Sequence, residues 1–129
     1  MVADNSEFQI SDFKLENKES GILNLESGIA TAVKKRVKRV MWERVGILRD
    51  KDALIRALKE FAQIEQSNLS TSSRNFVTLA KLVATSALWR EESRGGHFRN
   101  DFTELDEKFR VHSIQKLGAE ISSSAKINF

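Results

Sequence analysis

The sequence contains no cysteine and no proline. Without cysteine, the chain cannot form disulfides, thiolate metal sites or iron–sulfur clusters, and it has no cysteine nucleophile. Proline interrupts helices because its ring fixes the backbone and removes an amide donor. Its absence therefore favours long uninterrupted helices over a fold rich in loops.

Glycine and histidine are scarce, with six glycines and two histidines in 129 residues. The glycines form neither G-x-G-x-x-G nor a P-loop, so we expect no standard nucleotide cradle. His97 and His112 share no metal-ligand spacing, and no serine has a histidine and an aspartate placed to activate it. We therefore predict no catalytic, cofactor-binding or metal-ligating residue in this chain.

Long apolar runs are missing as well. No stretch reaches the roughly 18 apolar residues of a membrane span, and the polar N-terminus is not typical of a signal peptide. The length fits one domain, and 40% hydrophobic with 30% charged residues is ordinary for a folded soluble protein. We expect a cytoplasmic domain that is not a complete enzyme.

Residues 1–25 are polar and acidic, with five carboxylates against two lysines. Their few apolar residues follow no sustained period, because strand-like pairs at 8/10 and 13/15 are out of register with each other. We interpret this part of the chain as an extended polar arm or interdomain linker.

Apolar residues then recur at steps of three and four, which is the spacing of amphipathic helices. A first helix is predicted to begin at Glu26, and a second to span Lys51–Gln66 with Asp50 as its N-cap. The expected buried stripes are Ile29, Val33, Val37, Val40, Met41, Val45 and Leu48 in the first helix, and Leu54, Ala57, Leu58, Phe61 and Ile64 in the second.

A third helix is predicted over Arg74–Arg94, with Ser72 or Ser73 as its N-cap and Gly95-Gly96 at its end. Its expected stripe comprises Phe76, Leu79, Ala80, Val83, Ala87 and Arg90, broadened by Val77, Leu82, Leu88 and Trp89. Core packing is also the default expectation for both tryptophans, Trp42 and Trp89.

Three amphipathic helices with short connections predict an all-α fold, a spectrin-repeat-like up-down-up bundle over residues 26–96. After residue 96 the helical period is lost. We expect residues 97–129 to form an extended segment and tail that pack on the bundle, with a short strand at 109–116.

The densest group of charged residues follows the third predicted helix, at residues 90–102. On one interpretation, Arg94, His97 and Arg99 form a site for an anion or substrate. On the other, they belong to a salt-bridged turn that fixes how the next segment crosses the bundle. The residue chemistry favours the turn, because helix ends commonly collect such side chains.

The first predicted helix carries a basic run at Lys34, Lys35, Arg36, Lys38 and Arg39. Such a run could bind nucleic acid. The formal net charge is only +3, however, and Trp42 is the single aromatic nearby. A solvated helix face, or one that meets an acidic partner, is the better interpretation.

Two strings occur together, MWERVGILRDKDALIRAL at 41–58 and LWREESRGGHFRNDF at 88–102. Together they resemble the C-terminal helical domain of the L-aspartate oxidases, in the wider succinate dehydrogenase and fumarate reductase flavoprotein family. Residues 92–102 match the family signature E-S-R-G-[AG]-H-x-R-x-D-[FY]. Thr103 and Phe109 depart from the family's usual proline and tryptophan. The resemblance covers roughly residues 26–115.

The resemblance implies that FAD belongs to a parent enzyme that oxidises L-aspartate to iminoaspartate in NAD biosynthesis. The FAD-binding and capping domains would be this domain's partners, and the chain alone would be inactive. Arg94, His97, Arg99 and Asp101 would brace the interdomain interface. An isolated domain would also expose an apolar patch and could form a homodimer through it. The alternatives are a domain of a succinate dehydrogenase or fumarate reductase flavoprotein, and a stand-alone basic helical interaction module.

Overall fold

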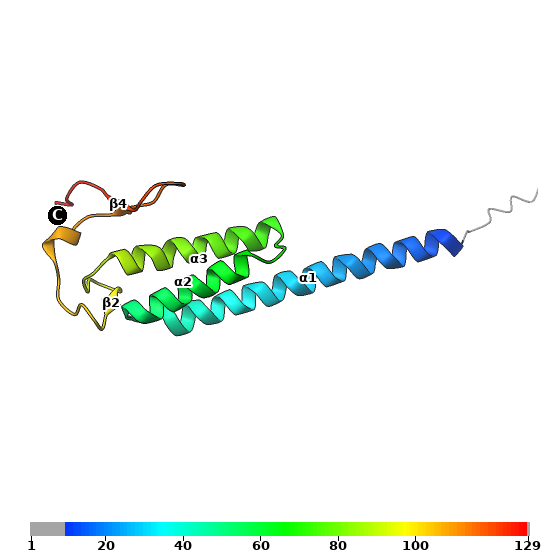
Figure 1. Cartoon of the computed structure of the whole chain (residues 1–129), viewed down its shortest axis with the longest axis horizontal. Helices are drawn as coiled ribbons and strands as arrows, with labels where there is room; N and C mark the ends of the chain where they lie inside the picture. Colours follow the sequence, from blue (N-terminus) through cyan, green and yellow to red (C-terminus); the bar gives the residue numbers. More distant parts are fainter. Residues whose placement is uncertain (1–9, 129) are drawn as a thin grey trace, which may run out of the picture.

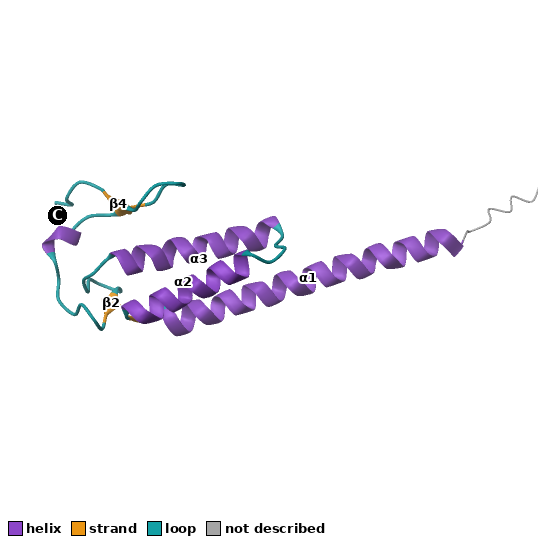
Figure 2. Ribbon diagram, in the orientation of Figure 1, coloured by secondary structure: helices purple, strands orange, loops and turns teal. Residues whose placement is uncertain are grey.

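The computed structural model describes residues 10–128. Three helices, α1 (Ile10–Arg44), α2 (Lys51–Glu65) and α3 (Thr71–Trp89), run up, down and up beside one another (Figure 1). The remaining elements are short: β1 (Leu48–Arg49), β2 (Phe98–Arg99), the 3-10 helix η1 (Glu107–Phe109), β3 (Ser113–Ile114) and β4 (Ser122–Ser123) (Figure 2). The prediction of an all-α three-helix bundle is confirmed.

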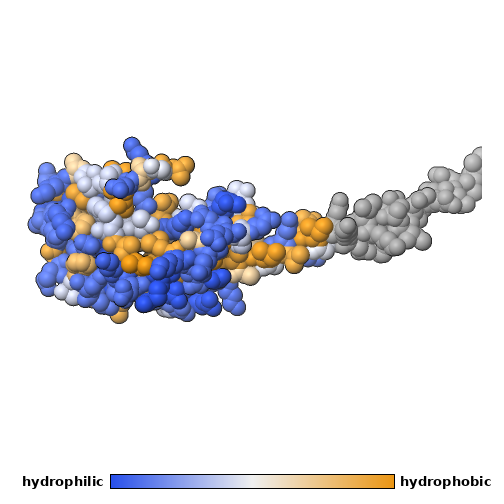
Figure 3. Space-filling model, viewed as in Figure 1, coloured by the Kyte–Doolittle hydropathy of each residue, from blue (hydrophilic) through white to orange (hydrophobic). Residues whose placement is uncertain are grey.

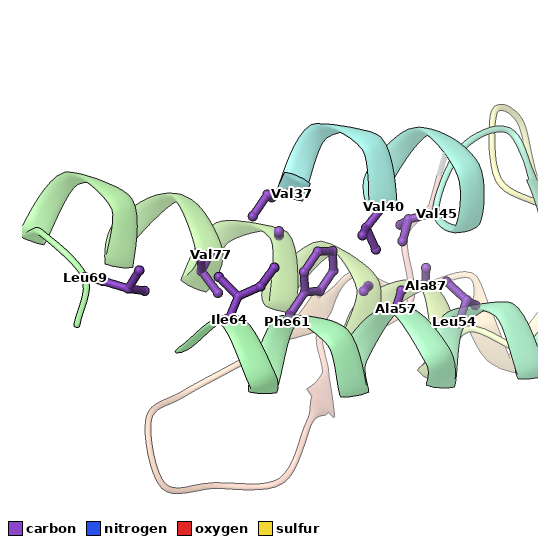
Figure 4. Close-up of a cluster of buried hydrophobic side chains, with 12 residues drawn as sticks. Val37, Val40, Val45, Leu54, Ala57, Phe61, Ile64, Leu69, Val77 and Ala87 are labelled. Carbon is purple, nitrogen blue, oxygen red and sulfur yellow. The ribbon is translucent and has the colours of Figure 1, made fainter. Parts of the chain in front are cut away.

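The core lies between the three helices (Figure 4). Phe61 and Leu54 of α2 are fully buried in it. Apart from Leu69, the other members are small or β-branched residues that let the helix axes approach closely: Val37, Val40, Val45, Ala57, Ile64, Val77, Ala80, Ala84 and Ala87. Burying a large apolar side chain such as that of Phe61 contributes about 2–3 kcal/mol.

The start of α2 follows the sequence prediction, because the Asp50 carboxylate accepts a hydrogen bond from the Ala53 amide at 2.8 Å. The prediction for α3 is wrong at both ends. Its N-cap is Ser70, whose hydroxyl accepts from the Ser73 amide, and Ser73 itself is buried. The helix ends at Trp89 rather than Arg94, because Arg90 has extended backbone angles.

The predicted extended conformation of residues 1–25 is wrong from Ile10 onward, where the chain is already in α1; residues 1–9 lie outside the described part. Without proline, nothing in this run breaks the helix. As a result, α1 extends well beyond α2 and α3 (Figure 1). Ile22, Leu23, Leu25 and Ile29 of α1 are exposed. Figure 3 shows apolar surface on this helix where it leaves the bundle.

The face of α3 that is buried differs from the predicted one. Val77, Ala80, Ala84 and Ala87 face the core, whereas the bulkier Leu79, Leu82 and Val83 are exposed. Close packing against α2 selects the alanine stripe, because larger side chains would separate the helix axes.

The first predicted stripe is also only partly correct. Ile29 is exposed, α1 ends at Arg44, Val45 is buried beyond the helix, and Leu48 lies exposed in β1. Core packing of Trp42 is wrong, since the residue is 83% exposed. Helical geometry explains this result, because position 42 faces away from the buried Val37 and Val40.

The segment after residue 96 packs on α3. The Ser113 hydroxyl donates to that of Ser86 at 3.1 Å, and the Gln115 amide donates to the Leu82 carbonyl at 2.7 Å. β3 pairs antiparallel with β4, so the strand predicted at 109–116 is present but short. Trp89 is half-buried, with its ring edge-on to that of Phe109 at 5.0 Å. Within residues 10–128, no helix has the length and apolarity needed to cross a membrane.

Candidate functional site

The motif that follows α3 forms a tight turn. The backbones of Arg94 and His97 exchange two hydrogen bonds, at 2.8 and 3.1 Å. Gly95 has a φ of 58°, in the left-handed region that glycine adopts without strain. The glycine pair therefore reverses the chain after α3 has ended, instead of ending the helix as predicted.

Arg99 is fully buried against the C-terminus of α3. Its Nη1 donates to the carbonyls of Ala87, Leu88 and Arg90 at 3.0–3.1 Å. Carbonyls in the last turn of a helix have no partner within the helix, and the helix dipole favours a cation at this end. Arg99 therefore acts as a side-chain cap for α3.

Asp101 joins this cap to the start of α2. Both of its carboxylate oxygens accept from Arg99, each at 2.7 Å, and Oδ2 also accepts from the Lys51 amide at 3.1 Å. The hydrogen bonds from Arg99 lower the pKa of Asp101, even though burial opposes this shift. A carboxylate at the N-terminus of α2 is also favoured by the dipole of that helix.

Glu92, unlike Asp101, is a fully buried carboxylate, with 0% exposure. It accepts from Arg90 at 2.6 Å, from Arg94 at 2.9 and 3.1 Å, and from the Asp106 amide at 2.8 Å. Burial alone would raise the pKa of Glu92, but the hydrogen bonds from Arg94, Asp106 and Arg90 lower it to about 2. Arg90 also donates to the Phe109 and Val111 carbonyls, so Glu92 and Arg90 together hold the segment after η1.

His97 connects the turn to the end of α1. Arg49 Nη1 lies 2.6 Å from His97 Nδ1, and the Arg90 carbonyl lies 3.1 Å from Nε2. Burial, together with the nearby arginines, lowers the pKa of His97. A neutral ring protonated on Nε2 satisfies both contacts. Arg49 in turn donates from Nε to the carbonyls of Val45 and Gly46 after α1.

The site is thus a clamp that joins one end of all three helices, made of Arg49, Arg90, Glu92, Arg94, His97, Arg99 and Asp101. All four sequence-predicted site residues, Arg94, His97, Arg99 and Asp101, belong to it. Arg99 and Asp101 are in direct contact, whereas the His97 ring contacts Arg49 and the Arg94 side chain contacts Glu92. Sequence reasoning did not single out Glu92, although a carboxylate between Arg90 and Arg94 is a signal for a buried ion pair.

The contacts favour the salt-bridged turn over an anion site, because the clamp arginines already donate to acceptors within the chain. Among the described residues, no buried side-chain nitrogen or oxygen lacks a hydrogen-bond partner. A cavity of about 390 Å³ lies beside Arg49, Arg90 and His97, but the exposed Leu82 and Val83 form much of its wall.

Gly95 and Gly96 border open space, because a Cβ built on either would meet no protein atom within 4 Å. The buried polar side-chain atoms of the described residues all have partners within the chain, so none of them is left for a flavin to contact. No group of three or more metal-ligating side chains occurs among residues 10–128. His112 is exposed on the segment before β3.

Residues 70–127 match the family described as fumarate reductase flavoprotein C-term. An uncharacterized FAD-dependent oxidoreductase of Methanocaldococcus jannaschii is 39% identical over 92 residues, which cover 62% of this chain and 17% of that protein. The L-aspartate oxidase of Pyrococcus abyssi is 38% identical over 78 residues, covering 60% of this chain and 16% of that enzyme. The chloroplastic L-aspartate oxidase of Arabidopsis thaliana is 34% identical over 98 residues, covering 64% and 15%.

A solved structure has a similar fold. In the Mycobacterium smegmatis Sdh1 complex in the apo form, one chain matches 86% of this chain and 24% of its own length, with a TM-score of 0.59 and 19% identity. The alignments with the Methanocaldococcus, Pyrococcus and Arabidopsis proteins cover only 15–17% of the length of those proteins. The matched residues 70–127 include the whole signature at 92–102. Residues 70–127 of this chain therefore belong to the family of C-terminal domains of fumarate reductase flavoproteins.

Proposed function

We propose that this chain is the C-terminal helical domain of an FAD-dependent L-aspartate oxidase. The parent enzyme would oxidise L-aspartate to iminoaspartate in NAD biosynthesis. The supporting observation is the identity of 34–38% to enzymes named L-aspartate oxidase from Pyrococcus abyssi and Arabidopsis thaliana. The FAD, the substrate and a cytoplasmic location all belong to this proposal, and the Arabidopsis relative is chloroplastic.

Within such an enzyme, the domain would pack against the FAD-binding and capping domains and would not be catalytic alone. Arg94, His97, Arg99 and Asp101 would brace that interface by fixing the end of the bundle. The support is their geometry, since the clamp connects α3 to α2 through Asp101 and to the end of α1 through Arg49. Buried ion pairs of this kind fix orientation more than they add net stability.

A chimera tests the proposal. In the Pyrococcus abyssi L-aspartate oxidase, the aligned C-terminal region is replaced by the aligned residues of this chain, and the unmodified enzyme is the control. We expect the purified chimera to retain FAD near one equivalent and to oxidise L-aspartate. A chimera that folds but releases its FAD, or that leaves L-aspartate unoxidised, would contradict the proposal.

The alternative parent is a succinate dehydrogenase or fumarate reductase flavoprotein. It is favoured by the family that matches residues 70–127 and by the fold shared with the Sdh1 complex. The same exchange into a fumarate reductase flavoprotein separates the two parents. Under our proposal, only the L-aspartate oxidase chimera retains its flavin and turnover.

A further inference from the structure

The parallel pair of β1 and β2 has two different faces. Leu48 lies opposite Phe98, and Arg49 lies opposite Arg99. Side chains alternate across a strand, so the arginines and the apolar residues point in opposite directions. Arg99 is fully buried in the clamp, whereas Leu48 is 66% exposed and Phe98 38% exposed. The burial of Arg99, with Arg49 half-buried beside it, therefore presents an apolar pair at the surface.

Two further apolar residues are exposed close by in the chain. Ile47 directly precedes β1 and is 74% exposed, and Trp42 in the last turns of α1 is 83% exposed. We call Trp42, Ile47, Leu48 and Phe98 the end patch. None of them belongs to the core, and tryptophan is enriched among the residues that dominate the binding energy of protein interfaces.

The end patch has a basic flank on α1. Lys35, Lys38 and Arg39 are exposed and precede Trp42 by seven, four and three residues, so they share its side of the helix. Among the described residues, no carboxylate forms an ion pair with Lys35 or Lys38, and Arg39 reaches Glu60 only at 4.0 Å. The surface therefore combines apolar residues with a basic flank in which Lys35 and Lys38 have no carboxylate partner among the described residues.

We propose that the end patch is the docking surface for the flavin-binding part of the parent enzyme, which would present an apolar area bordered by carboxylates. The inference rests on the proposed function and names the contact face. A second copy fits this surface poorly, because a two-fold interface is self-complementary and would bring two basic flanks together. The clamp then has an indirect role in docking, since Arg49 and Arg99 hold in place the two strands that carry Leu48 and Phe98.

In the isolated chain, the fluorescence emission of Trp42 tests whether a second copy or nucleic acid binds the end patch instead. In the Trp89→Phe variant it is the only tryptophan, and we expect red-shifted emission that stays constant as protein concentration rises. A blue shift with concentration would assign the end patch to a second copy and overturn the proposal. Quenching by a 20-base-pair DNA duplex that fades steeply with salt would assign it to nucleic acid, with the same consequence.

The chimera described above tests directly whether the end patch contacts the flavin-binding part. Trp42→Ala combined with Leu48→Ser removes the apolar centre, and Lys38→Glu reverses a flank charge. The matched controls are Leu79→Ser, an exposed leucine on α3, and Lys116→Glu, an exposed lysine after β3. All substituted residues are exposed, so each variant of the isolated chain should keep its thermal midpoint.

We expect end-patch variants to release FAD and to be cleaved by a protease at the domain junction roughly tenfold faster, as when an interface hot spot is truncated. Control variants should match the unsubstituted chimera. If end-patch variants behave like the controls while the unsubstituted chimera holds FAD, the docking face is wrong and the proposed function stands. If the unsubstituted chimera cannot hold FAD, both proposals fail.

Discussion

Arg99 caps a helix from a position twelve residues beyond Ala87, the first carbonyl that it contacts. A side chain this far along the chain can cap α3 only because the turn at Gly95 brings the chain back. The guanidinium suits the position, since its planar fork pairs with both Asp101 oxygens while Nη1 remains free for carbonyls. An ammonium group lacks this geometry.

Arg99→Met should therefore destabilise the chain by about 1–3 kcal/mol, because it leaves the carbonyls at the end of α3 without their donor. Arg99→Lys should recover only part of this loss, because lysine cannot pair with both Asp101 oxygens. Urea denaturation followed by circular dichroism measures both variants, with the exposed Arg56→Lys as control. A loss below about 1 kcal/mol for Arg99→Met would refute the role of this residue as a cap.

Glu92 makes the clamp sensitive to acid. Its pKa is about 2 in the folded chain against 4.5 ordinarily, so its contribution is fully present above pH 4.5 and is lost as the pH falls toward 2. The shift corresponds to at most ~3 kcal/mol. Glu92→Gln should lower the free energy of unfolding at pH 7 and flatten its dependence between pH 5 and 2. Urea titrations at several pH values test this, and an unchanged slope would contradict it.

At the scale of elements, the end of α1 depends on Gly46. A Cβ on this residue would lie 2.7 Å from the Trp42 carbonyl oxygen, which is closer than real Cβ atoms approach. Gly46→Ala should thus destabilise the chain by roughly 1–3 kcal/mol, as overpacking does. Gly28→Ala is the matched control, because a Cβ there meets no atom within 4 Å and should stabilise α1 by up to about 1 kcal/mol. Thermal melts compare the two, and equal shifts would contradict this reason for a glycine at 46.

At the scale of the whole molecule, the described chain is a folded bundle in which the conspicuous charged residues serve internal contacts. The arginines at the end of α3 bind carbonyls and carboxylates of the same chain. We therefore expect the purified chain to bind no FAD and to leave L-aspartate unoxidised. Absorbance at 450 nm and an oxygen electrode measure these outcomes. Stoichiometric flavin with turnover would show that the chain does more than support a separate catalytic domain.

Local patterns predicted several features correctly because short-range physics decides them. The capping of α2 by Asp50 follows from one carboxylate and the amide three residues later. The stripe of α2 was also predicted, since its apolar residues lie on one side of the helix with charged residues on the other. The motif at 92–102 identified the family, because its residue types at fixed spacing are specific.

Packing decided what these patterns left open. The buried face of α3 consists of alanines because three helices must approach closely, and a pattern that weighs every apolar residue alike favours Leu79 and Val83 instead. Trp42 is exposed because the partners of α1 cover only the side that carries Val37 and Val40.

The sequence by itself determined the helical class, the N-cap of α2 and the family, because periodicity, capping and motif spacing are properties of neighbouring residues. Only the tertiary structure decided the role of the charged motif. Asp101 and Lys51 come from separate parts of the chain, and their contact exists only once α2 and α3 lie side by side. The same folding buries Arg99 of β2 and turns Leu48 and Phe98 outward.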